Sequence, residues 1–295
     1  MTEVSSSGGP GSRVVRDGLY FGEGPRWHDG RLWYSDFYDH AVHALAPDGA
    51  DERVLEVAGQ PSGLGWLPDG RMLVVSMLDR RVLRVERDGT VTLHADLGRL
   101  AGGHANDMVV DHAGRAYVGN FGFDLEAWHD GSGGLATTVL ARVDPDGTAA
   151  VAADELLFPN GMVITGDGRV LVVAETFASR LTAFDVGPDG LLSGRRVWAD
   201  LAGAVASPDG ICLDAEGAVW VASATEPRCV RVGEGGVVLQ EAGFSQRCFA
   251  CMLGGEAGRT LYAMTAPTSR ASTASAAPGG RIEAAAVAVP RAGLP

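Results

Sequence analysis

Four side chains that carry oxygen ligands recur at one position of a repeated sequence pattern. They are Glu23 in GEGPRW, Asn106 in HANDMVV, Asn160 in FPNGMVI and Asp209 in SPDGICL. Carboxylate and amide oxygens are the ligands that hard divalent cations such as Ca²⁺, Mg²⁺ and Mn²⁺ prefer. Zinc also accepts oxygen ligands, although no histidine or cysteine occupies this position. We therefore expect one divalent cation, with Ca²⁺ favoured and Mg²⁺, Mn²⁺ or Zn²⁺ as alternatives.

The register of these residues is defined by turns that contain glycine and recur six times along the chain. The turn glycines are Gly30, Gly70, Gly114, Gly168, Gly217 and Gly258. Asn106, Asn160 and Asp209 lie eight residues before their glycines, whereas Glu23 lies seven residues before its own; Ser62 and Ala250 hold the position in the remaining repeats. Ordinary P-N-G and P-D-G turns are an alternative interpretation, but they do not explain why acids and amides share one register.

Each repeat has the pattern of four short β-strands joined by hairpins. A short apolar segment precedes each turn, and several repeats add a second hairpin, as in HALAPDGADERVL and ARVDPDGTAAV. D-G and G-G turns between apolar runs are typical of β-hairpins. Four strands in about forty to fifty residues match one propeller blade. The sequence therefore predicts an all-β, six-bladed β-propeller, with four-stranded antiparallel blades around a central channel.

The predicted propeller is a single domain over residues 13–295, preceded by a disordered Ser/Gly-rich leader at 1–12. We expect SRVVRDG at 12–18 to pair with the sixth blade and close the ring, which removes open sheet edges. RIEAAAVAV near the C-terminus is expected to be an outer strand of that blade. The Ser/Thr/Ala stretch 268–279 is expected to be a loop.

The first strand of each blade lines the channel in such a fold, so the register positions converge at one channel mouth. The second strands run antiparallel to the first, and their ends should therefore reach the same mouth. These ends carry candidate pocket residues, namely Asp36, Phe37, Met77, Asn120, Phe121, Glu175 and Thr176. His104 lies two residues before Asn106 and is a further candidate substrate contact.

Composition narrows the possible partners and location. The 295 residues are 46% hydrophobic and 21% charged, as in soluble globular proteins, and the formal net charge of −13 disfavours nucleic acid and anionic membranes. No apolar stretch is long enough for a transmembrane helix and no signal-peptide pattern occurs. The CFAC segment lacks the second C-x-x-C pair of a zinc site. We expect buried core thiols in a reduced, cytoplasmic protein, and the oligomeric state is not predicted.

Four motifs give the chain a resemblance to a known family. GEGPRW, NDMVVD, FPNGM and SPDGICLDAEGAVWVAS resemble, in order and spacing, the SMP-30/gluconolactonase/luciferin-regenerating-enzyme (LRE-like) family, from about residue 14 to the end. The resemblance implies a six-bladed propeller with one divalent metal in its channel and lactone hydrolysis as the activity. It implies Glu23, Asn160 and Asp209 as metal ligands and Asp209 as catalytic base. It also implies that Asn106 contacts the metal, its water or the substrate.

Two departures from the family pattern bear on the substrate. His104 stands where sugar-lactonase members often carry arginine, and the loop GNFGFDLEAW contains Phe121 and Phe123, with Asp124 and Glu126 as its acids. A site with few hydroxyl partners discriminates poorly in favour of hydroxyl-rich substrates. We therefore expect a small-molecule lactone that is less sugar-like than gluconolactone.

The predicted activity is that of a divalent-metal-dependent lactonase, a carboxylic ester hydrolase. The metal would polarise the carbonyl, and Asp209 would accept a proton from the attacking water. A carboxylate that binds a dication is a weakened base, so a free oxygen of Asp209 and a hydroxide generated by the metal both remain open. Alternative functions are phosphotriester hydrolysis or a non-hydrolytic ring opening or closure at the same site. A non-enzymatic binding propeller is the second alternative.

Overall fold

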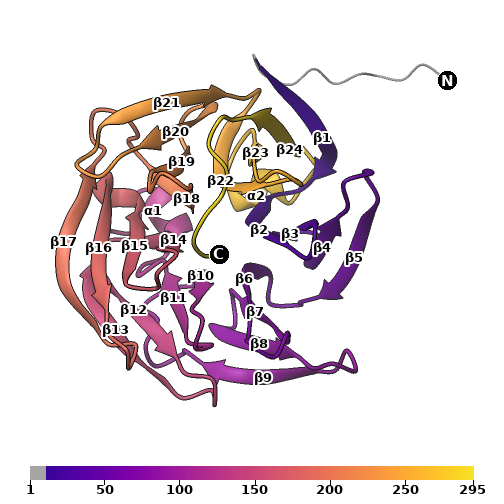
Figure 1. Ribbon diagram of the computed structural model, residues 1–295. Helices are drawn as coiled ribbons and strands as arrows, with labels where there is room; N and C mark the ends of the chain where they lie inside the picture. Colours follow the sequence, from indigo (N-terminus) through magenta and orange to yellow (C-terminus); the bar gives the residue numbers. More distant parts are fainter. Residues whose placement is uncertain (1–10) are drawn as a thin grey trace.

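Six four-stranded antiparallel sheets form a ring around a central channel in the computed structural model, which describes residues 11–295 (Figure 1). In the first five blades the strands are hydrogen-bonded in chain order. The first strands of neighbouring blades contact one another around the axis. The predicted all-β, six-bladed propeller is therefore confirmed.

The strands divide into blades as follows. The first blade contains β2 (Gly22–His28), β3 (Arg31–Asp36), β4 (Ala41–Leu45) and β5 (Asp51–Glu56), and the second contains β6 (Pro61–Trp66), β7 (Met72–Ser76), β8 (Arg81–Val85) and β9 (Val91–Asp96). The third contains β10 (Ala105–Val110), β11 (Ala116–Asn120), β12 (Thr138–Val143) and β13 (Ala149–Leu156), and the fourth contains β14 (Pro159–Ile164), β15 (Val170–Glu175), β16 (Arg180–Val186) and β17 (Leu192–Asp200). The fifth contains β18 (Pro208–Leu213), β19 (Val219–Ser223), β20 (Arg228–Val232) and β21 (Val238–Gly243). The sixth contains β22 (Arg247–Gly254), β23 (Thr260–Ala266), β24 (Gly280–Ala286) and β1 (Ser12–Leu19).

The two ends of the chain close the ring. Strand β1 pairs antiparallel with β24, from Ser12 opposite Ala285 to Leu19 opposite Gly280, as the sequence predicts. The proposed leader falls mostly on residues 1–10, which lie outside the described residues, and its last residue, Ser12, begins β1. RIEAAAVAV contributes to β24, the third strand of the sixth blade. The stretch 268–279 is not entirely a loop, because it contains the one-turn helix α2 (Ala271–Ala274).

Glycine follows the register residue in four inner strands because neighbouring strands approach closely there. A Cβ on Gly63 would lie 2.4 Å from the backbone nitrogen of Met108, and one on Gly161 would lie 2.5 Å from that of Ile211. The P-S-G, P-N-G and P-D-G segments lie within β6, β14 and β18. Their interpretation as ordinary turns is therefore wrong, and the glycines serve inter-blade packing.

The shorter hairpin of the first blade explains why Glu23 is offset by one residue from the other register positions. His28 pairs with Arg31 across Asp29 and Gly30, which both have positive φ angles, 48° and 74°. This geometry is that of a tight two-residue hairpin turn. In the second blade Trp66 pairs with Met72, so residues 67–71 form a longer connection. The offset therefore arises in the turn and leaves the strand unchanged.

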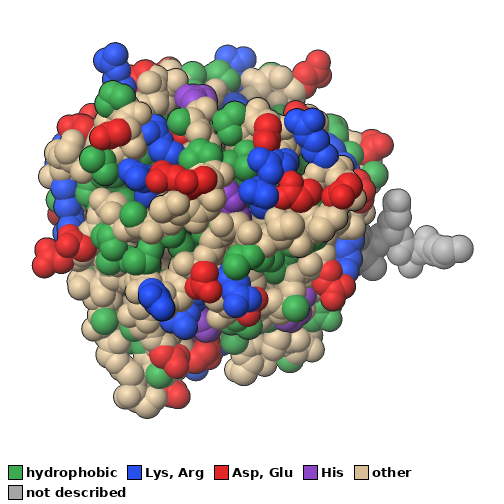
Figure 2. Space-filling model, turned by 90° about the horizontal axis from the view of Figure 1, so that it is seen from below, with side chains coloured by type: hydrophobic (Ala, Val, Ile, Leu, Met, Phe, Trp, Pro, Cys, Tyr) green, Lys and Arg blue, Asp and Glu red, His purple; other side chains and the backbone are tan. Residues whose placement is uncertain are grey.

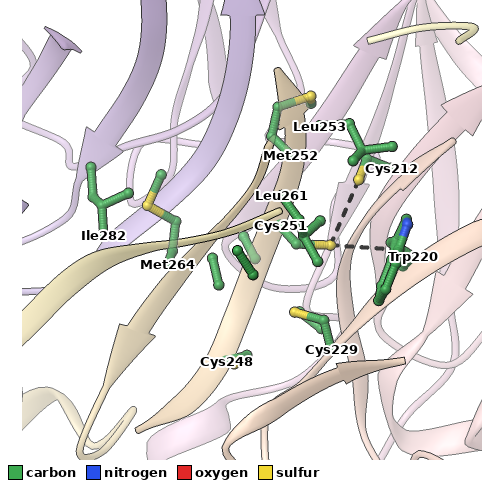
Figure 3. Packing of buried hydrophobic residues seen from close by; sticks show 14 of the residues in the cluster. Cys212, Trp220, Cys229, Cys248, Cys251, Met252, Leu253, Leu261, Met264 and Ile282 are labelled. Atoms are coloured by element: carbon green, nitrogen blue, oxygen red, sulfur yellow. Dashed lines mark hydrogen bonds between the residues drawn. The ribbon is translucent and has the colours of Figure 1, made fainter. Parts of the chain in front are cut away.

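The four cysteines lie together in the hydrophobic core between the fifth and sixth blades (Figure 3). Cys212 Sγ is 3.9 Å from Cys251 Sγ, and the Cys251 thiol donates to the backbone oxygen of Trp220 at 3.5 Å. Burial raises the pKa of both thiols well above its ordinary value, so they remain protonated. The prediction that the CFAC segment supplies core residues on a strand is confirmed by β22.

Acidic and basic side chains intermingle on the side of the disc seen in Figure 2. Salt bridges such as Arg71–Asp69 and Arg142–Asp144 pair charges elsewhere along the described chain as well. No helix within residues 11–295 has the length and apolarity that a membrane-spanning helix requires.

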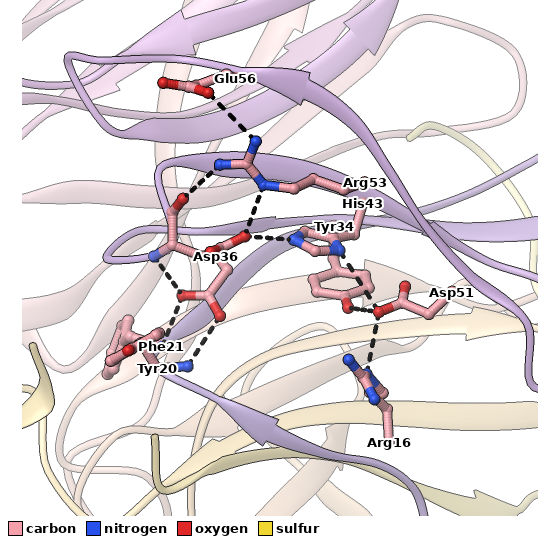
Figure 4. Close-up of polar contacts among 10 residues, drawn as sticks. Arg16, Tyr20, Phe21, Tyr34, Asp36, His43, Asp51, Arg53 and Glu56 are labelled. Carbon is pink, nitrogen blue, oxygen red and sulfur yellow. Dashed lines mark hydrogen bonds and ion pairs between the residues drawn. The ribbon is translucent and has the colours of Figure 1, made fainter. Parts of the chain in front are cut away.

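A polar network connects the first blade to the strand that closes the ring (Figure 4). His43 Nε2 lies 3.0 Å from Asp39 Oδ2, and His43 Nδ1 lies 3.4 Å from Asp51 Oδ2. Asp51 also pairs with Arg16 of β1 at 3.0 Å. Burial disfavours the charged imidazole, but the hydrogen bonds and charges of Asp51 and Asp39 outweigh desolvation and raise the pKa of His43.

We expect the His43→Gln substitution to destabilise the protein more at pH 5.5 than at pH 8.5. A histidine whose folded-state pKa is raised contributes stability below its unfolded pKa, and this contribution is lost as pH rises through the folded pKa. Urea unfolding at pH 5.5, 7.0 and 8.5 measures the difference from the wild-type protein. His112→Gln, at an exposed position, is the matched control. A destabilisation by His43→Gln that does not change with pH would contradict the assignment.

Candidate active site

The four register residues occupy equivalent places in four inner strands. Glu23, Asn106, Asn160 and Asp209 are the second residues of β2, β10, β14 and β18. Their exposed fractions are 9%, 6%, 5% and 8%. Because the inner strands surround the channel, the four side chains gather at one mouth, as the repeat alignment predicts.

A cavity of about 550 Å³ opens at this mouth, and Glu23, Asn106 and Asp209 are among its lining residues. Asn160 lies beside them, because its side chain hydrogen-bonds Asp209. Asn160 Nδ2 also donates to Thr176 Oγ1 at 3.1 Å. These contacts use the amide hydrogens of Asn160 and leave its Oδ1 as the atom suited to a cation.

Glu23 and Asp209 are buried carboxylates that repel one another. Desolvation, together with the nearby negative charge of Asp107, raises the pKa of Glu23 to about 8, although a hydrogen bond from the Gly24 amide and the charge of Arg26 oppose the shift. Desolvation, followed by the charges of Glu23 and Asp107, raises the pKa of Asp209 well above its usual range. Within residues 11–295, neither carboxylate forms a salt bridge with an arginine, lysine or histidine.

This donor set fits a hard divalent cation. Two buried carboxylates without a cationic partner are unfavourable by themselves, and a dication would offset both desolvation and mutual repulsion. In the described part of the chain, no three His, Cys, Asp or Glu side chains form a potential metal cluster. A cation at this mouth would therefore need amide oxygens in addition to the two carboxylates, and Asn160 can supply one.

Asn106 differs from the other three residues. Its Nδ2 is buried and has no hydrogen-bond partner, while its Oδ1 lies 3.5 Å from the hydroxyl of Ser62. A buried donor without an acceptor costs free energy. An acceptor atom of a ligand in the cavity would satisfy it.

Arg26 and Asp107 belong to the site although neither stands at a register position. Both are buried, and Arg26 Nη2 lies 2.5 Å from Asp107 Oδ1 and 2.6 Å from the carbonyl oxygen of Met108. Arg26 Nε donates to the carbonyl oxygen of Leu64 at 3.0 Å. One guanidinium thus links β2, β6 and β10. The signal was present in the sequence, since an arginine inside GEGPRW falls on a strand that lines the channel.

Four of the five predicted substrate or metal-water contacts line the cavity, Asn106 among them, and one does not. His104, Phe121 and Asp124 are among the lining residues. Glu175 is fully buried outside the lining, and its carboxylate accepts hydrogen bonds from Arg180, Thr182 and the Leu157 amide. Glu175 is therefore corrected from a substrate contact to a structural ion-pair residue.

The predicted strand-end residues divide in the same way. Phe37, Met77 and Thr176 line the cavity. Asp36 accepts hydrogen bonds from the Tyr20 and Phe21 amides, and Asn120 Oδ1 accepts from Gly102, Gly122 and Thr138. The last strand residues, Asp36 and Asn120, thus accept hydrogen bonds from neighbouring loops, whereas the residues that follow them, Phe37 and Phe121, line the cavity.

Two short helices cover the mouth from opposite blades. Helix α1 (Leu125–His129) follows β11 of the third blade, and α2 follows β23 of the sixth. The Ala271 amide donates to Glu126 Oε1 at 3.4 Å, and Arg270 Nη2 donates to the carbonyl oxygen of His129 at 3.4 Å. Figure 1 places both helices near the axis of the ring. We call α1 and α2 the cover of the cavity.

Fold and site together define a class of protein: six-bladed β-propellers with a centre of carboxylates and amides at one channel mouth. The chain matches the family model described as the SMP-30/Gluconolactonase/LRE-like region over residues 21–267. It belongs to this family, and the resemblance carried by the four motifs is confirmed.

Individual relatives agree with this assignment. Pentonolactonase XacC of Haloferax volcanii is 28% identical over 219 residues, 72% of this chain and 69% of that protein. Regucalcin of Oryctolagus cuniculus is 30% identical over 268 residues, 84% of each chain. Among solved structures, a calcium-binding protein, regucalcin, from Agrobacterium tumefaciens has a TM-score of 0.78 at 22% identity, covering 97% of this chain and 95% of that chain. At this identity the structural similarity shows the shared fold alone.

We expect Arg26→Met to lower the free energy of unfolding by about 3–5 kcal/mol, because it leaves the buried Asp107 carboxylate unpaired. Urea unfolding measures the change. Arg196→Met, which breaks the exposed pair with Asp185, is the matched control and should cost less than about 1 kcal/mol. Adding Asp107→Leu to Arg26→Met should restore part of the loss. A double variant no more stable than Arg26→Met would contradict this explanation.

Proposed function

We propose that the chain is a lactonase that requires one divalent cation held by Glu23, Asn160 and Asp209. The observation that carries the proposal is that Glu23 and Asp209 line a covered cavity, with Asn160 beside Asp209. Membership of the family and similarity to a protein named pentonolactonase support lactone hydrolysis as the reaction. Ca²⁺ is the favoured ion, with Mg²⁺, Mn²⁺ and Zn²⁺ as alternatives, because the donors are oxygens.

Asp209 and Asn106 would have different roles in lactone hydrolysis. When bound, the cation would supply Lewis-acid polarisation of the lactone carbonyl. Water adds to the carbonyl carbon and the ring C–O bond breaks, while Asp209 accepts a proton from the water and returns it to the departing alkoxide, giving a hydroxy acid. The unpartnered Nδ2 of Asn106 donates a hydrogen bond to the substrate or to the water.

The cavity supports a substrate with fewer hydroxyl groups than gluconolactone. Desolvation lowers the pKa of His104, which disfavours the charged imidazole and so a role like that of a permanently charged arginine. Its ring centroid lies 5.7 Å from that of Phe121. Asp124 Oδ1 accepts a hydrogen bond from the Ala127 amide at the start of α1. Asp124 is therefore partly used by the cover.

The expected location and partners follow the same reasoning. All four cysteines are free buried thiols, which is consistent with a reducing, cytoplasmic compartment. A small-molecule lactone is the proposed partner, and the net charge of −13 argues against nucleic acid.

We expect the wild-type protein to bind one divalent cation per chain. Glu23→Gln, Asn160→Ala and Asp209→Asn should each weaken this binding by at least about tenfold, because the first and third remove a negative charge and the second removes an oxygen ligand. Calorimetric titration of chelator-treated protein with Ca²⁺ measures the affinity. Glu234→Gln, which removes an exposed carboxylate, is the matched control. Unchanged affinity in the Asn160 and Asp209 variants would reject the assigned centre.

We expect lactone hydrolysis to disappear in the presence of chelator and to return on addition of a divalent cation. Asp209→Asn should lower kcat by about 10²–10⁴-fold, the range for loss of a general base. The assay uses sugar, aliphatic and aromatic lactones, together with a phosphotriester. Turnover of the phosphotriester alone, or conversion of a lactone without hydroxy-acid formation, would favour the alternative reactions. Absence of any turnover would favour a binding propeller.

A further inference from the structure

The phenylalanines of this chain are concentrated around one cavity. The sequence contains nine of them, and six line the cavity above Glu23 and Asp209, namely Phe21, Phe37, Phe121, Phe158, Phe177 and Phe249. The inter-blade cores are built mainly from Val, Leu, Ala and Met instead. Phe21, Phe37 and Phe249 belong to a separate buried cluster with Met77, and Phe121 packs against it.

One wall of the cavity is formed by the first and sixth blades. Phe21 precedes β2, Phe37 follows β3, and Phe249 lies in β22. The centroid of Phe21 lies 5.4 Å from that of Phe37 and 4.8 Å from that of Phe249. These three rings form a continuous apolar surface with tilted contacts, which aromatic rings favour.

The third and fourth blades form the other wall. Phe121 follows β11, Phe158 precedes β14, and Phe177 lies in the short helix η1 (Thr176–Ala178). Phe121 and Phe158 stack with a centroid distance of 4.5 Å and an interplanar angle of 18°, and Phe158 contacts Phe177 edge-on at 5.2 Å. In a ring of six blades the third and fourth lie opposite the sixth and first. The two walls therefore face one another across the channel mouth.

Two acids beside the cavity, Asp124 and Glu126, each use one carboxylate oxygen in contacts within the cover. Asp124 caps α1, and Glu126 accepts the Ala271 amide and lies 3.6 Å from the imidazole of His129. A hydroxyl group placed against the phenyl walls would lose its hydrogen bonds to water without replacement. A flat apolar ring would instead gain burial and aromatic contacts.

We infer that the substrate is a lactone fused to an aromatic ring, with the ring between the two phenyl walls and the ester above Glu23 and Asp209. This inference rests on the proposed lactonase function. The cavity of about 550 Å³ is within the size range of sites for small organic molecules. In this proposal the phenyl walls bind the aromatic ring, and the carboxylate and amide side chains at the channel mouth act on the ester.

The test compares δ-lactones that share one six-membered ester ring. They are isochroman-3-one, its saturated bicyclic counterpart, δ-valerolactone, δ-undecalactone and glucono-δ-lactone. Each kcat/KM is divided by the rate constant for alkaline hydrolysis, which removes differences in intrinsic reactivity. We expect isochroman-3-one to exceed each of the others by at least about tenfold, because only its ring makes aromatic contacts with both walls.

Substitutions in one wall connect this preference to the phenyl rings. Combining Phe121→Leu with Phe177→Leu keeps the wall apolar but removes two aromatic surfaces, and both positions are only partly buried. We expect kcat/KM for isochroman-3-one to fall about fivefold, mainly through KM, with less than about twofold change for δ-valerolactone. Phe184→Leu, the same substitution in β16 away from the cavity, is the matched control and should leave both values unchanged.

The outcomes distinguish failure of the aromatic-substrate inference from failure of the proposed lactonase function. Glucono-δ-lactone as the best substrate would overturn the aromatic assignment and leave the lactonase proposal intact. Equal or faster turnover of the saturated bicycle or δ-undecalactone would also overturn it. If no lactone is hydrolysed, the lactonase proposal fails. Calorimetric binding of the inert ketones 2-tetralone and 2-decalone then tests whether the cavity prefers an aromatic ring. Selective binding of 2-tetralone would support the aromatic cavity, whereas equal binding or none would overturn it.

Discussion

The buried guanidinium of Arg26 is the interaction on which the candidate site depends. It joins three inner strands, through Leu64 of the second blade and through Asp107 and Met108 of the third. Because Asp107 binds its positive charge at close range, Arg26 does not form a salt bridge with Glu23. The two carboxylates at the channel mouth consequently remain without a cationic side chain. The arrangement that links the first three blades therefore also leaves Glu23 and Asp209 without a cationic partner.

Burial of two carboxylates without a cationic partner lowers the stability of the fold. Packing between blades and closure of the ring offset this cost. Desolvation raises the pKa of both Glu23 and Asp209, and the nearby charge of Glu23 raises that of Asp209 further. The opposing stabilisation comes from the hydrophobic layers between blades and from β1, which closes the ring through β24 and through the Arg16–Asp51 pair. A closed ring holds the inner strands in place although the charges at their ends repel. The cost of burying the two carboxylates is thus offset by the packing and the ring closure described above.

The comparison of sequence and structure shows where repeat patterns are informative. The six turn glycines predicted the six blades, and the common register predicted that Glu23, Asn106, Asn160 and Asp209 would converge. Glu175 was misassigned because a strand-end position does not reveal the direction of the side chain or its pairing with Arg180. Neither Arg26 nor Asp107 stands at a register position, and the pairing of two blades far apart in sequence is not encoded in either repeat alone.

The sequence by itself determined the propeller, the identity of the polar residues at the channel mouth and the family, because local turns and strand periodicity repeat along the chain. Only the tertiary structure decided which residues surround the polar residues of the channel mouth. The two phenyl walls combine residues from the first, third, fourth and sixth blades, and the cover joins the third blade to the sixth. These contacts depend on closure of the ring, which brings distant repeats to face one another across the axis. No single repeat contains that information.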